Sequence, residues 1–403
     1  MNLTHIPHFI NTHITKRATS MFQSDLEKFS VQLSNEINSK SVLVIGGAGT
    51  IGSSFIKALL KFKPAKLIVV DTNENGLTEL TRDLRSEHGQ YIPAVFLTYP
   101  MNFGDHVFEK MFLKHAPFDI VANFAAHKHV RSEKDQFSIE AMLTNNVFKA
   151  KSFLDLLLKY KPKHFFCVST DKAANPVNVM GASKKLMEEL ILSYADQMKI
   201  STARFANVAF SNGSLLAGYI DRIFKKQPIS CPDDVKRFFV SPEESGQICL
   251  LACILGSSGA IFFPKLASNS MINFKDITLS FFKTMGVKVI HCNSENEARL
   301  KMKSGLRKNT YPVYFFKSNT SGEKLFEEFY TQNDSLQLDK FSSLGVIENS
   351  SKSSKSNIQE CISALKTLMN DPNYSKESII RVMKQFIADF DHIETGKNLD
   401  QKM

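Results

Sequence analysis

The chain has 403 residues, of which 43% are apolar, which is enough to bury one large or two moderate hydrophobic cores. The formal net charge is +10, but no arginine-rich tract, zinc-ligand spacing or RNA-binding signature accompanies it, so neither nucleic acid nor a metal is expected as a partner. The six cysteines are scattered, and no apolar run is long enough for a membrane span or placed like a signal peptide. These features predict a cytoplasmic protein without membrane segments.

Residues 1–40 show the apolar spacing of helices, and we expect them to form a helical N-terminal extension. This extension would pack on the body of the protein or on a partner subunit. The apolar positions that carry the pattern are Phe22, Leu26, Phe29, Val31, Leu33 and Ile37.

An apolar run at residues 42–45 leads into a glycine-rich turn of pattern GxxGxxG, and helical spacing follows the turn. Glycine allows a tight turn, close approach of the main chain to a pyrophosphate, and close packing of helix on strand, while the start of the helix offers free amides. The residues expected to hold a dinucleotide here are Gly46, Gly49, Thr50, Ile51 and Gly52.

A second apolar run, at residues 66–70, ends in Asp71. A carboxylate at the end of this strand accepts hydrogen bonds from the ribose hydroxyls of adenosine, and it repels a 2′-phosphate. The pattern therefore predicts NAD, and not NADP, as the cofactor.

The run HFFCV at residues 164–168 predicts a buried strand whose carboxyl end opens into a site. Three polar residues stand at its tip, namely Thr170, Asp171 and Lys172. Helical spacing returns from about Val179, after a stretch that is broken by Pro176. Met180 and Lys184 are therefore expected four residues apart on one face of a helix.

Together with flanking segments, these residues resemble the UDP-N-acetylglucosamine 4,6-dehydratases, a polysaccharide-biosynthesis branch of the extended short-chain dehydrogenases. The resemblance covers roughly residues 41–345. Its specific parts are AAHKHV, STDKAANPVNVMGASK, RFANVAFSNGS, KRFFVSPEES and SGEKLFEE.

The resemblance implies an α/β fold with an NAD-binding Rossmann domain, a doubly wound parallel sheet, at residues 41–210. A smaller mixed region that binds a nucleotide sugar would follow at residues 211–348. Residues 349–357 are rich in serine, lysine and asparagine and predict a linker, and residues 358–403 predict a helical C-terminal tail.

Extended short-chain dehydrogenases use a YxxxK pair, in which the lysine holds the nicotinamide ribose and lowers the pKa of the tyrosine so that it can accept a proton. Met180 stands at the tyrosine position here and cannot accept a proton, while Lys184 is kept. Members with methionine at this position resemble the type that retains the C5 configuration of the sugar.

The reaction that the resemblance implies moves a hydride from sugar C4 to NAD, removes water across C5 and C6, and returns the hydride to C6. It needs an acceptor for the O4 proton, a base for C5 and an acid for O6. Thr170 could bind O4, Asp171 is the expected acid, and Lys172 is the expected base if Lys184, the cofactor or burial lowers its pKa. Asp171, a water held by Thr170, and His127 are the candidate acceptors of the O4 proton, and Asp171 with water is favoured.

Further contacts also follow from the resemblance. Ala125 and Asn102 are expected at the cofactor, although the family commonly has aspartate at the position of Asn102. The residues expected at the substrate are Lys128, Met180, Asn207, Arg237 and Glu323. Arginine suits a diphosphate because its planar fork binds two phosphate oxygens at once.

Two other functions remain open from the sequence. A nucleotide-sugar 4-epimerase would share the scaffold but normally keeps the tyrosine, and a catalytically silent NAD-binding sensor would need no acid–base pair. Loss of water from the sugar separates these functions from a dehydratase. A homo-oligomer is expected because dimers are common on this scaffold.

Overall fold

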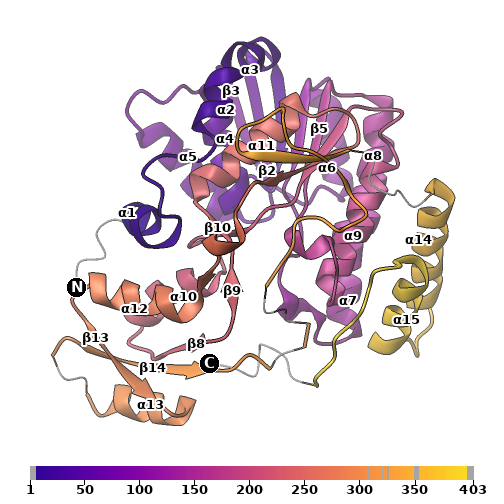
Figure 1. The fold of residues 1–403 in the computed structure, drawn as a ribbon. Coiled ribbons are helices and arrows are strands. Elements are labelled where there is room, and N and C mark those ends of the chain that lie inside the picture. Colours follow the sequence, from indigo (N-terminus) through magenta and orange to yellow (C-terminus); the bar gives the residue numbers. More distant parts are fainter. Residues whose placement is uncertain are drawn as a thin grey trace.

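The computed structural model describes residues 6–305, 308–319, 321–322, 324, 326–348 and 354–396. Their arrangement comprises a large α/β unit, a smaller α/β lobe below it, and a pair of C-terminal helices at the side (Figure 1).

The large unit is built on a sheet of nine strands in the described residues, in the order β15-β16-β11-β6-β5-β4-β1-β2-β3. Strands from β3 across to β11 run parallel, and β16 runs antiparallel to both of its neighbours, β11 and β15. The strands are β1 (Ser41–Ile45), β2 (Lys66–Asp71), β3 (Val95–Pro100), β4 (Ile120–Asn123), β5 (His164–Val168), β6 (Ile200–Ala203), β11 (Ala260–Pro264), β15 (Ser335–Gln337) and β16 (Leu344–Glu348). The chain leaves β1 in one direction for β2 and β3 and then returns to its other side at β4, which confirms the predicted doubly wound Rossmann fold.

Helices cover both faces of this sheet because the strands are apolar on both sides. Neighbouring side chains of β5 point to opposite faces: the Phe165 ring contacts Phe153 of α8, and the Phe166 ring contacts Phe124, which reaches Phe55 of α4. The helices of this unit are α4 (Thr50–Leu60), α5 (Glu74–Ser86), α6 (His106–His115), α7 (Gln136–Leu143), α8 (Lys149–Lys159), α9 (Val179–Leu192) and α11 (Pro242–Leu255), with short turns η2 (Val130–Glu133), η3 (Thr144–Phe148) and η4 (Asp171–Ala173).

The smaller lobe has a separate apolar core and a three-stranded parallel sheet in the order β13-β14-β8. Its elements are β8 (Ile229–Pro232), β13 (Lys288–Cys292), β14 (Thr310–Phe316), α10 (Leu215–Phe224), α12 (Phe274–Thr284), α13 (Glu295–Lys303) and the turn η5 (Ser268–Ser270). Two short strand pairs accompany it, β7 (Asn207–Val208) with β10 (Phe239–Val240) and β9 (Lys236–Arg237) with β12 (Ile272–Asn273).

The division between the two units differs from the predicted boundary at residue 210. Strands β11, β15 and β16 and helix α11 all fall within residues 211–348, yet they belong to the large unit. The chain therefore crosses between the units several times. A run of sequence that returns to an existing sheet carries no local signal of doing so.

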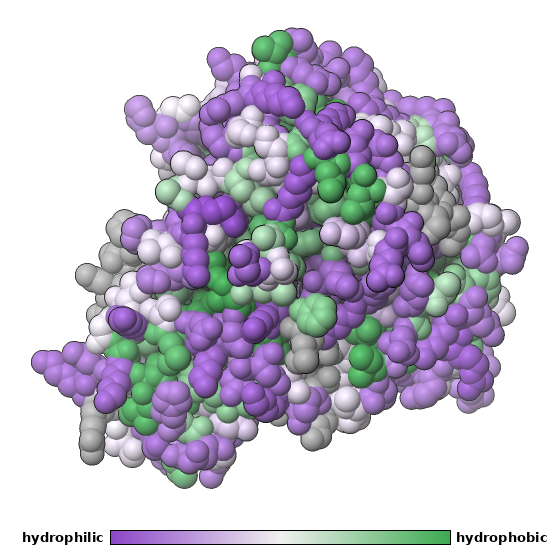
Figure 2. Space-filling view, in the orientation of Figure 1, coloured by the Kyte–Doolittle hydropathy of each residue, from purple (hydrophilic) through white to green (hydrophobic). Residues whose placement is uncertain are grey.

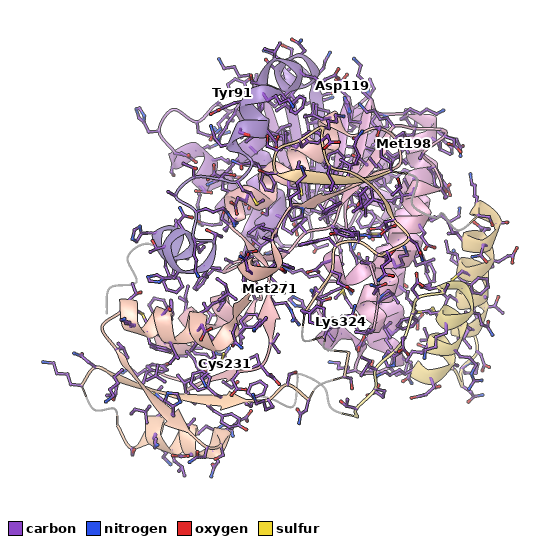
Figure 3. All side chains as sticks on the ribbon, in the orientation of Figure 1. Tyr91, Asp119, Met198, Cys231, Met271 and Lys324 are labelled. Atoms are coloured by element: carbon purple, nitrogen blue, oxygen red, sulfur yellow. The ribbon has the colours of Figure 1, made fainter. Side chains whose placement is uncertain are left out.

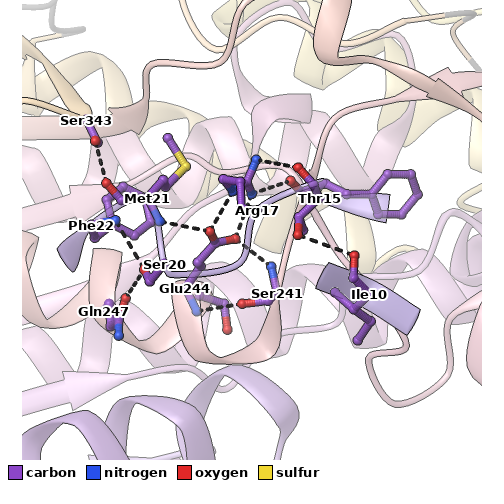
Figure 4. A network of polar contacts seen from close by, with 12 residues as sticks. Ile10, Thr15, Arg17, Ser20, Met21, Phe22, Ser241, Glu244, Gln247 and Ser343 are labelled. Carbon is purple, nitrogen blue, oxygen red and sulfur yellow. Dashed lines mark hydrogen bonds and ion pairs between the residues drawn. The ribbon is translucent and has the colours of Figure 1, made fainter. Parts of the chain in front are cut away.

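The N-terminal extension is helical, as predicted, with α1 (Ile6–Phe9), a π-helical turn η1 (Ile10–Ile14), α2 (Gln23–Lys28) and α3 (Ser30–Ile37). Phe9 belongs to the core of the smaller lobe, whereas Phe22 and Leu33 belong to the core of the large unit. Between them, the Arg17 guanidinium donates to both carboxylate oxygens of Glu244 at 2.8 and 2.7 Å (Figure 4). The extension therefore packs on the body of the protein and ties both units together.

The C-terminal region forms two helices, α14 (Lys355–Met369) and α15 (Lys376–Phe386), which lie beside α9 and α7 (Figure 1). Ser354 caps α14 by accepting from the Asn357 amide, so residues 355–357, which were expected in the linker, are helical. The chain after α15 then reaches the loop that precedes α9, where the Asp391 amide donates to the Pro176 carbonyl at 3.1 Å.

Hydrophilic residues cover most of the face seen in Figure 2, and hydrophobic residues form scattered patches on it. Within the part of the chain that the structure describes, no helix has both the length and the apolar character needed to cross a membrane.

Candidate functional site

The candidate site lies at the carboxyl edge of the central sheet, where it faces the smaller lobe. Asp119 directly precedes β4 and lies at the end of the large unit that points away from the smaller lobe. Met271 and Lys324 lie on the side of the large unit that faces the smaller lobe (Figure 3). A cavity of about 720 Å³ occupies this position, a volume suited to a small-molecule ligand. Nine predicted residues line it, namely Ile51, Lys128, Thr170, Asp171, Lys172, Met180, Lys184, Asn207 and Arg237.

The glycine turn between β1 and α4 brings main-chain atoms so close together that side chains larger than glycine would not fit at Gly46 and Gly52. Gly46 has a positive φ of +76°, and a Cβ there would lie 2.6 Å from the Ala125 nitrogen. A Cβ on Gly52 would lie 2.3 Å from the Gly46 carbonyl oxygen. Gly49 precedes α4 in extended conformation, so the amides of the first helical turn, from Thr50, point out of the helix start. These features fit the pyrophosphate of a dinucleotide.

Asp71 lies beside this turn, as expected for a ribose-binding residue. One of its oxygens accepts from the Ala48 amide at 3.0 Å and the other accepts from the Asn73 amide at 2.9 Å. Asn102 follows β3 on the neighbouring side, and its side-chain oxygen accepts from the Gly104 amide at 2.9 Å. Asn102 therefore shapes a local turn after β3, and its contact with the adenine stays a prediction.

At the tip of β5, the predicted acid and base are in direct contact. The Thr170 hydroxyl donates to one oxygen of Asp171 at 2.9 Å, and Lys172 Nζ donates to the same oxygen at 3.0 Å. Burial opposes the charge on Lys172, but the carboxyls of Asp171 and Glu327 outweigh it and raise the pKa of Lys172. The lowered pKa that a C5 base needs is therefore absent in the ligand-free protein, and Lys184 does not supply it.

Lys184 faces a different group. Its Nζ donates to the Val168 carbonyl at 2.7 Å, and burial lowers its pKa. Met180 is buried one turn earlier on α9 and lines the cavity, so the two residues share a face as predicted. Asn178 caps this helix by accepting from the Gly181 amide at 2.7 Å.

Glu327 is a site residue that the sequence reasoning missed. It lines the cavity, and its Oε1 lies 3.6 Å from Lys172 Nζ and 4.0 Å from an Arg237 nitrogen. Its Oε2 is buried without a hydrogen-bond partner among the described residues. Burial raises the pKa of Glu327, and the Asp171 charge adds to this effect against the opposing charge of Lys172. The predicted Glu323 lies outside the described residues. A carboxyl four residues further along the same SGEKLFEE segment was the available signal.

Several cationic side chains line the cavity and make it suitable for an anionic ligand. Lys128 Nζ donates to the Asn212 carbonyl at 3.2 Å, and burial lowers the pKa of Lys128. Arg237 lies on β9 and is buried, and the other cationic lining residues are Lys172, Lys184 and Arg222. The side chain of Asn146 holds the main chain of His127 on both sides, and His127 does not line the cavity, unlike its neighbours Lys128 and His129. His127 is therefore a poor candidate for the O4 proton.

Comparison with known proteins identifies the family. The family model described as "Polysaccharide biosynthesis protein" matches residues 42–349. An uncharacterised membrane protein of Methanocaldococcus jannaschii is 33% identical over 324 residues, which cover 78% of this chain and 87% of that protein. The chain belongs to the polysaccharide biosynthesis protein family.

Other relatives of this chain carry functional names. A UDP-N-acetylglucosamine 4,6-dehydratase (inverting) of Campylobacter jejuni is 28% identical over 246 residues, which cover 59% of this chain and 70% of that enzyme. The capsular polysaccharide biosynthesis protein CapD of Staphylococcus aureus is 28% identical over 75% of this chain, and the match spans 47% of CapD.

Solved structures share the fold. Pen of Bacillus thuringiensis has a TM-score of 0.63 at 22% identity, covering 79% of this chain and 90% of that chain. A UDP-N-acetylglucosamine 4-epimerase of Methanobrevibacter ruminantium, solved with UDP-N-acetylmuramic acid, has a TM-score of 0.53 at 15% identity, covering 74% and 91% of the two chains. Similarity at this level shows a common Rossmann-type architecture.

The C-terminal segment lies beyond the residues that match the family model, yet it holds two parts of the site. The Ile393 amide donates to the Val177 carbonyl at 3.0 Å, just before α9, and the Gly322 amide donates to the Ile393 carbonyl at 2.9 Å. Glu394 accepts from the Ser321 hydroxyl at 2.6 Å. We call residues 391–395 the clamp. It connects the loop that precedes Met180 with the segment that leads to Glu327.

Proposed function

We propose that this protein binds NAD and converts a UDP-N-acetylhexosamine, most simply UDP-N-acetylglucosamine, to its 4-keto-6-deoxy derivative by removing water. The observation that carries the proposal is the contact of Asp171 with Lys172 at the tip of β5, in a cation-lined cavity where Met180 replaces the usual tyrosine. A dehydratase needs such an acid–base pair next to the sugar, whereas an epimerase does not.

The glycine turn and Asp71 would hold NAD, with the pyrophosphate at the start of α4 and the adenosine ribose at Asp71. Bound NAD supplies the acceptor for the C4 hydride and the donor that returns it to C6. Lys184 remains the residue for the nicotinamide ribose. Arg237, Lys128 and Asn207 would bind the UDP diphosphate.

Proton accounting supports Asp171 as a shuttle between two oxygens. Asp171 accepts hydrogen bonds from Thr170 and Lys172, so it is set to take the O4 proton as the C4 hydride leaves. Over one turnover the O4 proton and the departing O6 hydroxyl together make the released water. One carboxyl that takes a proton from O4 and gives it to O6 closes this balance without a tyrosine.

Lys172 would remove the C5 proton and return it. When one amine removes and returns the proton on a single face of the sugar, the C5 configuration is retained. Retention at C5 would therefore depend on Lys172, and Met180 would mark the proteins that have this arrangement.

The test is to incubate the purified protein with NAD and UDP-N-acetylglucosamine and to follow the sugar nucleotide by mass and proton NMR. Dehydration predicts a product lighter by one water. An unchanged mass with altered C4 stereochemistry would instead identify an epimerase, and NAD binding without any turnover would identify a sensor.

A further inference from the structure

Lys172, the proposed C5 base, must be neutral to remove a proton, and the cavity contains a second carboxyl close to its amine. Lys172 Nζ donates a hydrogen bond to Asp171 at 3.0 Å, and the carboxyls of Asp171 and Glu327 raise the pKa of Lys172, which favours the protonated amine. A protonated amine cannot remove the C5 proton, so Lys172 must first lose its own proton inside a buried site.

Glu327 is the group placed to receive it. Its Oε1 lies 3.6 Å from Lys172 Nζ, so this amine is close to the Glu327 carboxyl as well as to the Asp171 oxygen that also accepts from Thr170. Its Oε2 is buried and lacks a hydrogen-bond partner among the described residues, which is a cost for a charged carboxylate and a smaller one for a neutral carboxyl. Arg237 lies 4.0 Å from the same carboxylate and is the residue expected to turn to the substrate diphosphate.

Substrate binding would therefore change the balance around Glu327. A diphosphate that engages Arg237 adds negative charge beside Glu327, and bound sugar excludes water from the cavity. Both changes disfavour the ionised carboxylate. Burial already acts in the same direction on its pKa.

We propose that Glu327 is a positioning residue that accepts the proton of Lys172 when substrate binds, so that neutral Lys172 can serve as the C5 base. In this step the Lys172 N–H bond breaks, a Glu327 O–H bond forms, and the ion pair becomes a neutral pair. The proton returns to Lys172 after the product leaves. This inference rests on the proposed function.

Glu327→Gln tests it, because glutamine keeps the shape but cannot accept the proton. Lys172 must then release its proton to water, and the neutral fraction of the amine grows with pH. We expect the rate of water loss at pH 7 to fall at least about 100-fold, and to recover by about tenfold per pH unit toward pH 9, whereas the wild-type rate stays nearly flat. Exchange of the C5 proton in deuterated water should slow in parallel.

Glu328→Gln is the matched control. Glu328 is the next residue, is exposed, and accepts from the Asn175 side chain at 2.9 Å, so this variant should keep the wild-type rate and pH profile. Glu327→Asp retains a carboxyl and should keep a flat pH profile at a lower rate. A Glu327→Gln enzyme within threefold of wild type, or one slowed equally at every pH, would overturn the inference.

A second readout needs no substrate. The rate at which formaldehyde and borane methylate Lys172, followed by mass spectrometry over a range of pH, reports the pKa of the amine. We expect Glu327→Gln to lower that pKa, since one of two neighbouring carboxyls is lost, and an unchanged value would contradict the pairing. Failure of the proposed function would show itself separately, as a wild-type protein that releases no water from UDP-N-acetylglucosamine.

Discussion

The cofactor side and the substrate side of the cavity are built in different ways. The cofactor side is a main-chain structure: Gly46 and Gly52 lie within one turn, and Asp71 comes from the adjacent strand. The substrate side is a side-chain structure in which Lys172, Arg237 and Glu327 come from three distant segments. The first can be read from one stretch of sequence, whereas the second exists only when the chain is folded.

This difference decides which features of the site could be predicted from the sequence. The strand–turn–helix around Gly46 and the shared helix face of Met180 and Lys184 follow local patterns, and the predicted Rossmann fold is confirmed. Glu327 was missed because the SGEKLFEE segment holds several carboxyls, and the sequence does not show which of them meets Lys172 in the folded chain.

Two further features could not be predicted from local sequence patterns. The return of β11, β15 and β16 to the central sheet depends on strand pairing across the whole chain. The clamp at residues 391–395 reaches Val177 through main-chain hydrogen bonds, which any sequence can make.

The largest expected effect comes from breaking the substrate side alone. Asp171→Asn should reduce water loss by about 100-fold or more, because an amide cannot carry the proton from O4 to O6. NAD affinity, measured by fluorescence titration, should remain within twofold of wild type. Activity equal to that of the wild type would remove Asp171 from the mechanism.

A substitution on the cofactor side should instead weaken the binding of NAD. Gly52→Ala places a Cβ at 2.3 Å from the Gly46 oxygen, so the turn must open. We expect NAD affinity to weaken at least about tenfold, or about 1.4 kcal/mol, in the same titration. If Gly52→Ala binds NAD with the wild-type affinity, the glycine turn does not bind the NAD pyrophosphate.

The clamp should have a smaller effect, confined to the substrate side. Ile393→Pro removes the amide that donates to Val177 and should lower kcat several-fold while leaving NAD affinity unchanged. Ile393→Ala keeps that amide and is the control, since the side chain is 41% exposed. Equal kcat values for the two variants would show that the main-chain contact has no part in shaping the site.

The smallest effect is expected at Met180. Met180→Tyr restores the residue that most extended short-chain dehydrogenases carry, yet the rate of water loss should change by no more than about threefold, because Asp171 already accepts the O4 proton. A large gain in rate would mean that the methionine is a defect and that the proton path through Asp171 is incomplete.

The most direct test of the account follows the hydride. UDP-N-acetylglucosamine labelled with deuterium at C4 should give a product that has lost one water and carries the deuterium at C6, as seen by NMR. Deuterium that remains at C4, with no loss of water, would contradict the 4,6-dehydration that Asp171 and Lys172 are proposed to perform.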